Sequence, residues 1–254
     1  MRLTTVGTGT AAPSPGRVSS GHLVECGQAL VLMDCGSGVV HRMAEFGLRW
    51  PDITHVVLTH FHHDHTGDLP TLIFAWRHGM MPARSAGIQI IGPAGTSDLL
   101  DRTSIASGAW VREPGFPVSV REMEPGETFE LASGVTIGAH RTPHTDESLA
   151  YALTTAGHRL VYTGDTGFDE GLAEWASGCD LLLAECSLPQ AMALPTHLTP
   201  EQCGQLAALA RPGRLALTHF YPPVERVDIR AAVATAFDGP LTLAVDGWTL
   251  DLEE

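Results

Sequence analysis

The sequence predicts an α/β fold of two similar halves that pack sheet to sheet, with helices outside. Short apolar runs alternate along the chain with amphipathic stretches of helical spacing. The segment VVLTHF at 56–61 is echoed by LALTHF at 215–220, which indicates that the two halves are related. No linker, charge block or low-complexity segment separates them, so we expect a single domain over 1–254.

The apolar runs are expected to be strands and the longer amphipathic stretches helices. In the first half we expect strands at 3–7, 22–27, 29–34, 54–60 and 88–93, and helices at 38–47, 68–79 and 94–106. In the second half we expect strands at 118–123, 127–132, 135–141, 149–155, 158–165, 180–185, 214–220 and 241–245, and helices at 169–178, 199–210 and 227–237. The Gly- and Pro-rich segment 7–21 breaks both patterns, and we expect an ordered loop at the mouth of a site rather than a plain surface loop.

The composition disfavours several kinds of partner. The formal net charge is -14 and lysine is absent, so the surface repels a long polyanion such as a nucleic acid. The five cysteines are odd in number and lack CxxC spacing, which favours reduced buried thiols over disulfides or a thiolate zinc site. No apolar run is long enough to span a membrane and the N-terminus lacks a signal-peptide pattern, so we expect a cytoplasmic protein without a membrane partner.

The segment LTHFHHDHTGD at 58–68 places many metal-capable side chains directly after an apolar strand. Residues two apart in an extended chain point the same way, so His60 and His62 are expected to bind one ion. The chain then turns into a helix and carries Asp64 and His65 to another side of the same pocket, where they could bind a second ion.

Two ions need more ligands than one loop supplies, and three further polar residues follow other apolar strands: His144, Asp165 and His219. We therefore assign His60, His62 and His144 to the first ion, Asp64, His65 and His219 to the second, and Asp165 to both as a bridge. Imidazoles and carboxylates without thiolate suit two Zn²⁺ ions best, and Mn²⁺ or Fe²⁺ next.

Other polar residues receive different assignments. A single histidine is usually structural or on the surface, which we expect for His22, His41, His55, His78, His140 and His158. For His63 two interpretations stay open: a side chain exposed to solvent, or one that supports the metal ligands without binding the ion. Asp68 is expected to cap the helix that follows it, and Asp34 to orient a ligand imidazole.

The His-x-His-x-Asp-His motif of His60, His62, Asp64 and His65 resembles the hallmark of the metallo-β-lactamase superfamily, and the resemblance covers nearly the whole chain. The chain is most similar to ribonuclease Z and its small relatives, through VGTGTAAPSPGR, LMDCG, AECS, THLT and LTHF. This resemblance implies a four-layer αββα sandwich, usually a homodimer, that holds two zinc ions on the seven residues assigned above.

The resemblance also implies that His197, in the THLT motif, is a catalytic histidine. Thr199 is then placed to cap the following helix. Glu185, at the end of the apolar run 180–185, is expected either to hydrogen-bond His197 or simply to cap a strand.

The sequence departs from ribonuclease Z in two places. Relatives with a tRNA-binding arm carry a long Gly/Pro-rich insertion between the third histidine and the bridging aspartate, but only a short segment separates His144 from Asp165. Tyr162 stands where some relatives place an acidic residue. Because the arm is missing and the surface is acidic, we expect a small ester substrate, and a nucleic-acid substrate is disfavoured.

The combined pattern predicts a dinuclear metal-dependent hydrolase that cleaves a small phosphodiester by attack of metal-bound hydroxide. Asp64 is expected to hold the nucleophile and His197 to protonate the leaving group. The alternatives are hydrolysis of a lactone, aryl sulfate or phosphotriester, tRNA 3′ processing, and metal binding without catalysis. Seven residues near strand ends could equally form substrate walls, core or a dimer interface: Trp76, Met80, Met81, Trp110, Phe116, Phe220 and Tyr221.

Overall fold

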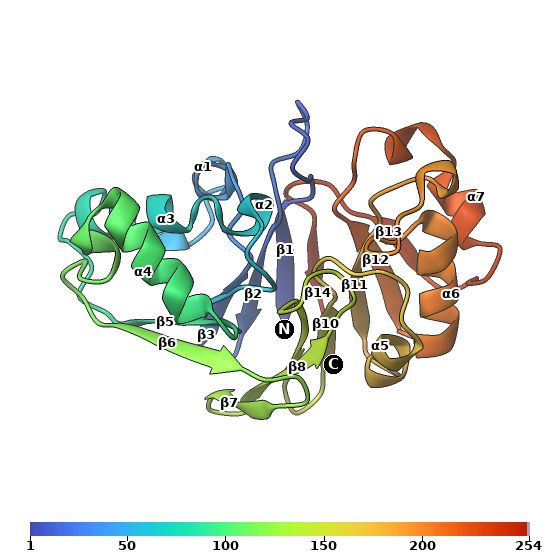
Figure 1. Cartoon of the computed structure of the whole chain (residues 1–254). Coiled ribbons are helices and arrows are strands. Elements are labelled where there is room, and N and C mark those ends of the chain that lie inside the picture. Colours follow the sequence, from blue (N-terminus) through green and yellow to red (C-terminus); the bar gives the residue numbers. More distant parts are fainter. Residues whose placement is uncertain (253–254) are drawn as a thin grey trace.

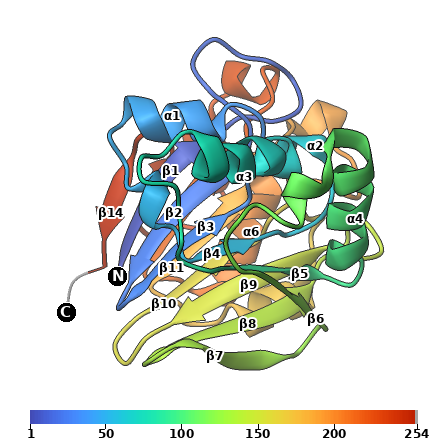
Figure 2. The same cartoon turned by 90° about the vertical axis from the view of Figure 1, so that its left-hand side faces the viewer.

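Two seven-stranded sheets lie face to face, and helices cover their outer faces (Figure 1). The computed structural model describes residues 1–252. Helices α1 to α4 lie outside the first sheet and α5 to α7 outside the second (Figures 1 and 2). The predicted four-layer αββα architecture is therefore confirmed. Within 1–252, no helix has both the length and the apolar character needed to cross a membrane.

The first sheet has the strand order β14-β1-β2-β3-β4-β5-β6. Its strands are β1 (Arg2–Gly7), β2 (Gly21–Cys26), β3 (Ala29–Met33), β4 (His55–Val57), β5 (Ile88–Pro93), β6 (Val118–Met123) and β14 (Thr249–Asp251). The pairs from β14 to β3 are antiparallel, and those from β3 to β6 are parallel. The sequence analysis did not predict β14, which pairs with β1 and returns the end of the chain to the first sheet.

The second sheet has the order β13-β12-β11-β10-β9-β8-β7. Its strands are β7 (Thr128–Ala132), β8 (Val135–Arg141), β9 (Leu149–Thr154), β10 (Arg159–Tyr162), β11 (Leu181–Glu185), β12 (Arg214–Thr218) and β13 (Leu241–Leu243). The pairs from β7 to β10 are antiparallel and those from β10 to β13 are parallel. Both sheets thus change from antiparallel to parallel pairing, in agreement with two similar halves.

The helices follow the predicted pattern with some differences in length. They are α1 (Val39–Glu45), α2 (His63–Thr66), α3 (Leu69–His78), α4 (Thr96–Ser107), α5 (Glu170–Trp175), α6 (Pro200–Ala210) and α7 (Ile229–Val233). Thr199 caps α6 through a capping box with Gln202, as predicted. Helix α7 is much shorter than the predicted 227–237. Asp228 caps its start by accepting a hydrogen bond from the backbone N–H of Ala231 (3.0 Å), and residues 234–236 form turns that do not continue the helix.

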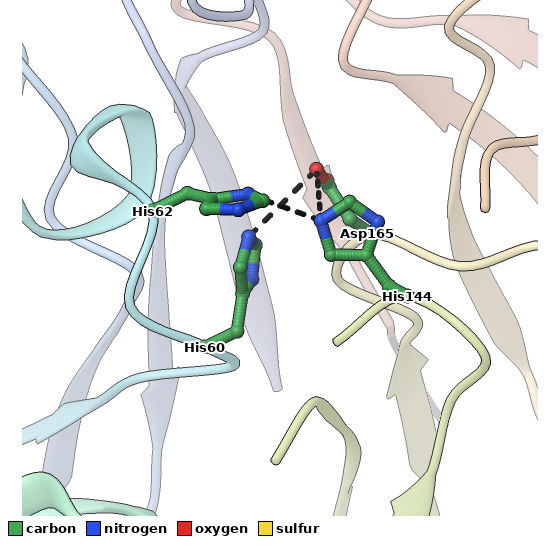
Figure 3. A group of neighbouring side chains, drawn as sticks. All are labelled: His60, His62, His144 and Asp165. Atoms are coloured by element: carbon green, nitrogen blue, oxygen red, sulfur yellow. Dashed lines mark hydrogen bonds and ion pairs between the residues drawn. The ribbon is translucent and has the colours of Figure 1, made fainter. Parts of the chain in front are cut away.

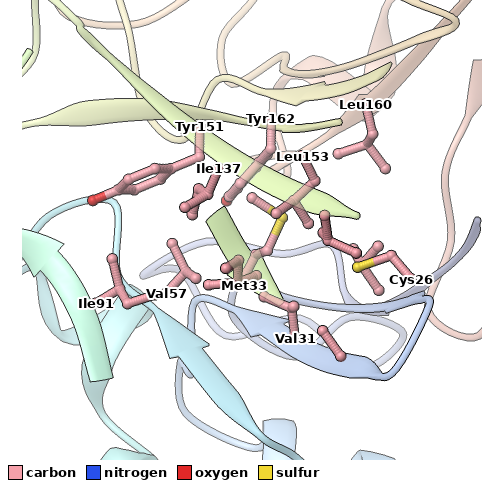
Figure 4. Packing of buried hydrophobic residues seen from close by; sticks show 14 of the residues in the cluster. Cys26, Val31, Met33, Val57, Ile91, Ile137, Tyr151, Leu153, Leu160 and Tyr162 are labelled. Atoms are coloured by element: carbon pink, nitrogen blue, oxygen red, sulfur yellow. The ribbon is translucent and has the colours of Figure 1, made fainter. Parts of the chain in front are cut away.

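The central core lies between the two sheets (Figure 4). It joins Val31, Met33 and Val57 of the first sheet to Ile137, Leu153 and other side chains of the second. Burying each such side chain contributes about 1.5–3 kcal/mol. The hydroxyl of Tyr151 donates to the backbone oxygen of Leu58 (3.1 Å), so its polar atom is satisfied between the sheets. This packing fixes the strand ends of both sheets relative to each other.

Candidate metal centre

Loops after strands of both sheets converge at one edge of the sandwich. His60 follows β4, Asp165 follows β10 and His219 follows β12, while His144 lies between β8 and β9. The carboxyl ends of neighbouring parallel strands meet at the same edge of a sheet, and ligand sites of α/β folds usually form there. The strand pairing therefore explains how residues that are far apart in the sequence reach one site.

The structure brings all seven assigned residues together. One group contains His60, His62, His144 and Asp165, and a second contains Asp64, His65 and His219. In each group, the nitrogen or oxygen atoms that could bind an ion lie within 4.8 Å of one another. Figure 3 shows the side chains of the first group turned toward a common centre. This arrangement fits the geometry expected from the sequence.

The carboxylate of Asp165 lies between the two groups. Its Oδ2 lies 3.9 Å from Nε2 of His60 and 3.6 Å from Nε2 of His144. Its Oδ1 lies 3.2 Å from Nε2 of His65 and 3.4 Å from Nε2 of His219. One oxygen thus faces each group, which is the position that a bridging carboxylate requires.

A short turn of helix divides the histidine-rich segment between the two groups. His62 has an extended backbone and precedes α2, whereas Asp64 and His65 lie within that turn. The change from strand to helix redirects the side chains, as the sequence analysis predicted. His63 belongs to neither group but lines the adjoining cavity.

The buried carboxylate of Asp34 orients an imidazole of the second group, that of His65, as expected. The Nδ1–H of His65 donates to its Oδ2 (2.7 Å). The carboxylate of Asp34 also accepts from the backbone N–H of Thr59 (2.8 Å) and from the hydroxyl of Tyr162 (2.8 Å). Asp34 (φ 58°) and His219 (φ 59°) both have left-handed backbones, which are costly for residues other than glycine. Such strained positions gather at functional sites, where the surrounding structure holds them.

A second buried carboxylate, that of Glu185, connects several parts of the site. Its Oε1 accepts from Nδ1–H of His197 (2.9 Å) and from the backbone N–H of Thr166 (2.8 Å). Of the two roles considered for Glu185, the hydrogen bond to His197 is the one observed. Burial disfavours the charged form of His197, but the bond to Glu185 outweighs burial and raises the pKa of His197 to about 9.

Ser187 is a residue that the sequence analysis did not assign to the site. Its hydroxyl donates to Oε2 of Glu185 and accepts from Nδ1–H of His219 (2.9 Å). The AECS motif contained this serine, but its sequence gave no sign that the hydroxyl would face His219 across the sheet.

The electrostatics of the site fit a bound cation. Burial, together with the nearby His65, lowers the pKa of His60 well below its usual value and keeps a nitrogen lone pair available. Burial disfavours ionisation of Asp165, but His219 and His65 hold the pKa of Asp165 well below its usual range. Within residues 1–252, the buried Nε2 of His60 and Oδ1 of Asp165 have no hydrogen-bond partner. A divalent cation would satisfy both atoms.

A cavity of about 690 Å³ opens onto these residues. Thr10, Ser14, Arg17 and Ser19 from the segment 7–21 line it, which confirms the prediction that this loop forms the mouth of the site. Tyr221 also lines the cavity. The volume lies within the roughly 300–1,000 Å³ of small-molecule sites.

Most of the other aromatic and Met residues considered as substrate walls do not reach this cavity. Trp76, Phe116 and Phe220 are buried in the hydrophobic core. Met81 is 99% exposed and is not part of the cavity wall. Of the three alternatives left open for these residues, the core is therefore the one observed for Trp76, Phe116 and Phe220, and Met81 faces solvent.

Asp68 also differs from its prediction. It precedes α3 but makes no side-chain cap with that helix. Its Oδ2 instead accepts from the backbone N–H of Val40 (3.0 Å), in the first turn of α1. Gly38 at the N-cap of α1 has no side chain to do this, so the neighbouring aspartate takes that role.

The six histidines that were expected to be structural lie outside both groups. The clearest case is His22, which is fully buried beside Tyr162 with a ring-centroid separation of 4.8 Å. Burial, followed by the influence of His65 and His219, lowers the pKa of His22 to about 3. It is therefore neutral at physiological pH.

Comparisons with known proteins agree with this fold. Residues 30–220 match the family model described as the Beta-lactamase superfamily domain. Ribonuclease Z of Mycobacterium bovis (strain BCG / Pasteur 1173P2) is 30% identical, and the alignment covers 97% of this chain and 96% of that protein.

Two solved structures give the same result. The metallo-beta-lactamase fold protein YhfI from Bacillus subtilis superimposes with a TM-score of 0.85 at 24% identity, over 98% of both chains. Human tRNase Z, short form (ELAC1), superimposes with a TM-score of 0.81 at 26% identity, over 100% of both chains. The chain therefore belongs to the metallo-β-lactamase superfamily and is a hydrolase of that fold.

Proposed function

We propose that this hydrolase is a dinuclear metal-dependent phosphodiesterase that acts on a small phosphodiester. The observation that carries the proposal is the position of Asp165, with one carboxylate oxygen facing each of two histidine-containing groups. Donor sets of imidazole and carboxylate suit Zn²⁺, with Mn²⁺ or Fe²⁺ as the next choices. The similarity to a protein named as a ribonuclease supports a phosphodiester as the bond that is cleaved.

The seven assigned residues would hold the two ions. His60, His62 and His144 would bind one, Asp64, His65 and His219 the other, and Asp165 both. When bound, divalent ions polarise a phosphoryl group and make water a stronger nucleophile near neutral pH.

Asp64 is placed to orient the attacking water. Its carboxylate lines the cavity, and its Oδ2 lies 3.4 Å from Nε2 of His219. Burial disfavours its charge, but the nearby His219 and then His65 outweigh burial and lower the pKa of Asp64. The ionised carboxylate can accept a hydrogen bond from water and hold it in line with phosphorus.

His197 is placed to protonate the departing oxygen. Its Nδ1 is bonded to Glu185, so the other ring nitrogen is the one available to substrate. The buried carboxylate fixes the orientation of the ring and stabilises its protonated form. A general acid in this position typically contributes about 10²–10⁴ in rate.

The cavity favours a small substrate. Arg17 is the one arginine in its wall among the described residues, and its guanidinium already bonds Glu225 (2.8 Å) and the backbone oxygen of Ala244 (2.7 Å). With a chain charge of -14 and no lysine, little positive charge remains to follow a polyanionic backbone. Hydroxyl groups from Ser14 and Ser19 would instead contact a compact, partly polar substrate.

A panel of nitrophenyl substrates tests this proposal. The purified protein is assayed with bis(p-nitrophenyl) phosphate, a p-nitrophenyl sulfate, a phosphotriester and a lactone, before and after chelation. We expect chelator-sensitive turnover that is fastest with the phosphodiester. Faster turnover of the sulfate, triester or lactone would contradict phosphodiester specificity, and the Asp165→Asn variant tests whether the activity depends on the bridging carboxylate.

Processing of tRNA is a second candidate because of the 30% identical relative named Ribonuclease Z. Between His144 and Asp165, however, the chain forms only the β9–β10 hairpin, whose strands end at Thr154 and begin again at Arg159. No arm extends from this hairpin to bind a large RNA. Cleavage of a precursor tRNA at a rate above that of the small diester would favour this second function.

A further inference from the structure

The two candidate metal positions have different surroundings. The outer position is defined by His60, His62 and His144, and the inner position by Asp64, His65 and His219. Asp165 serves both. All three residues of the inner position are buried, whereas His62 of the outer position is exposed. The inner position also has a carboxylate of its own, that of Asp64, and the outer position has only the shared one.

We propose that the inner position retains its metal ion more tightly than the outer position, because buried carboxylates support both of its imidazoles. This inference rests on the dinuclear site proposed above, but it does not depend on the substrate.

The first imidazole of the inner position is supported directly. The Nδ1–H of His65 donates to Asp34 across 2.7 Å, and both side chains are fully buried. Such a bond fixes the tautomer, so that Nε2 keeps its lone pair for an ion, and it raises the basicity of the ring. The hydroxyl of Tyr162 donates to the same oxygen of Asp34 (2.8 Å) and holds the carboxylate in place.

The second imidazole is supported through a hydroxyl. The Nδ1–H of His219 donates to Ser187 Oγ (2.9 Å), and that hydroxyl donates in turn to Oε2 of Glu185. The single proton of Ser187 goes to Glu185, with the backbone oxygen of His219 (3.3 Å) as a second acceptor in reach, so the hydroxyl oxygen can only accept from the imidazole of His219. The chain of bonds therefore fixes the tautomer of His219 with Nε2 free for an ion.

Among the described residues, no carboxylate other than the shared Asp165 contacts the histidines of the outer position directly. The Nδ1–H of His144 donates to the backbone oxygen of Thr196 (3.0 Å). His60 reaches Asp34 through the hydroxyl of Thr59 (3.0 Å), in the same kind of relay as the one behind His219, so the direct bond from His65 to Asp34 is what the outer position lacks. Within the described chain, the imidazole of His62 hydrogen-bonds only to His144. Neutral partners polarise an imidazole less than a carboxylate does, and solvent reaches this side of the site.

Ser187 is thus a positioning residue for the inner ion, and its hydroxyl can be removed with little change in volume. Thr218 provides a matched control, because it adjoins His219 and its buried hydroxyl has no hydrogen-bond partner among residues 1–252. Ser187→Ala removes a hydroxyl that supports His219. Thr218→Ser removes a methyl group from a side chain whose hydroxyl makes no hydrogen bond to His219.

The experiment measures stepwise metal binding. Metal-free wild type, Ser187→Ala and Thr218→Ser are titrated with Zn²⁺ against a competing chelator, and the d–d spectrum is followed in a parallel Co²⁺ titration. We expect two binding steps in wild type. Ser187→Ala should weaken the tighter step by roughly 10–100-fold and leave the weaker step nearly unchanged. Thr218→Ser should change neither step.

A second measurement needs no variant. Crystals of wild type loaded with one equivalent of Zn²⁺ should give an anomalous peak at the inner position. A stronger peak at the outer position, equal peaks, or a Ser187→Ala effect on the weaker step alone would overturn this inference while leaving the dinuclear site intact. A total of fewer than two ions bound at saturation would contradict the proposed dinuclear site itself.

Discussion

Replacement of His197 by alanine tests the proposed general acid. The bond of 2.9 Å from His197 to the buried Glu185 holds the ring at the cavity, and this role is worth about 10²–10⁴ in rate. At about 1.36 kcal/mol for each tenfold change, that range corresponds to roughly 2.7–5.4 kcal/mol of transition-state stabilisation. The full loss is expected only when the leaving group needs a proton.

We therefore expect His197→Ala to lower kcat by about 10²–10⁴ for a phosphodiester with an alkyl leaving group. Turnover of bis(p-nitrophenyl) phosphate should fall far less, because nitrophenoxide departs without protonation. The assay compares kcat for both substrates, with metal content measured on the same preparations. His63→Ala is the matched control, since His63 lines the same cavity but has no buried carboxylate partner among the described residues. In this variant, kcat for the two substrates should change by the same factor.

Unchanged turnover of the alkyl diester in His197→Ala would refute the general-acid role. Equal losses on both substrates would also refute it, because they would indicate that His197 positions the substrate or the site rather than donating a proton. Loss of bound metal in this variant would instead make His197 a ligand, which the grouping of Asp165, His197 and His219 allows geometrically.

Three further variants test the scaffold around the site. A Cβ at Gly167 would lie 1.9 Å from the backbone oxygen of Pro195, so Gly167→Ala should displace the loop before His197. Kinetics should then show a lower kcat, and elemental analysis should show that both metals stay bound. Arg84 donates to four backbone oxygens, so Arg84→Met should lower the free energy of unfolding by about 3 kcal/mol in urea without changing kcat of the folded protein. Thr199→Ala removes the cap of α6 and should cost about 1 kcal/mol in the same assay, and a change below 0.3 kcal/mol would contradict the capping role.

The gathering of these seven side chains could be predicted from the sequence because they lie in loops that follow apolar runs. His60 and His219 are the next-to-last residues of the two related segments VVLTHF and LALTHF, and both follow the ends of β4 and β12 in the two sheets. The alternation of a strand fixes which side chains face the same way, and parallel pairing brings the strand ends to one edge. These local rules are enough to bring the side chains of the candidate metal centre together.

Long-range partners could not be predicted in the same way. Strand β14 is only three residues long, and it is ordered by pairing with β1 at the other end of the chain. Nothing in the sequence distinguishes Ser187 from other serines, because its hydroxyl reaches His219 only through the parallel pairing of β11 and β12. The burial of Trp76 depends on how α3 packs on its sheet, which the helical spacing alone does not specify.

Metal content and activity measured on the same sample test the central claim most directly. The purified chain is analysed for bound metals and assayed with bis(p-nitrophenyl) phosphate as isolated, after chelation, and after reconstitution with Zn²⁺, Mn²⁺ or Fe²⁺. The dinuclear phosphodiesterase predicts about two ions per chain, loss of turnover on chelation and recovery on reconstitution. No bound metal after reconstitution, or turnover that survives complete removal of metal, would contradict it.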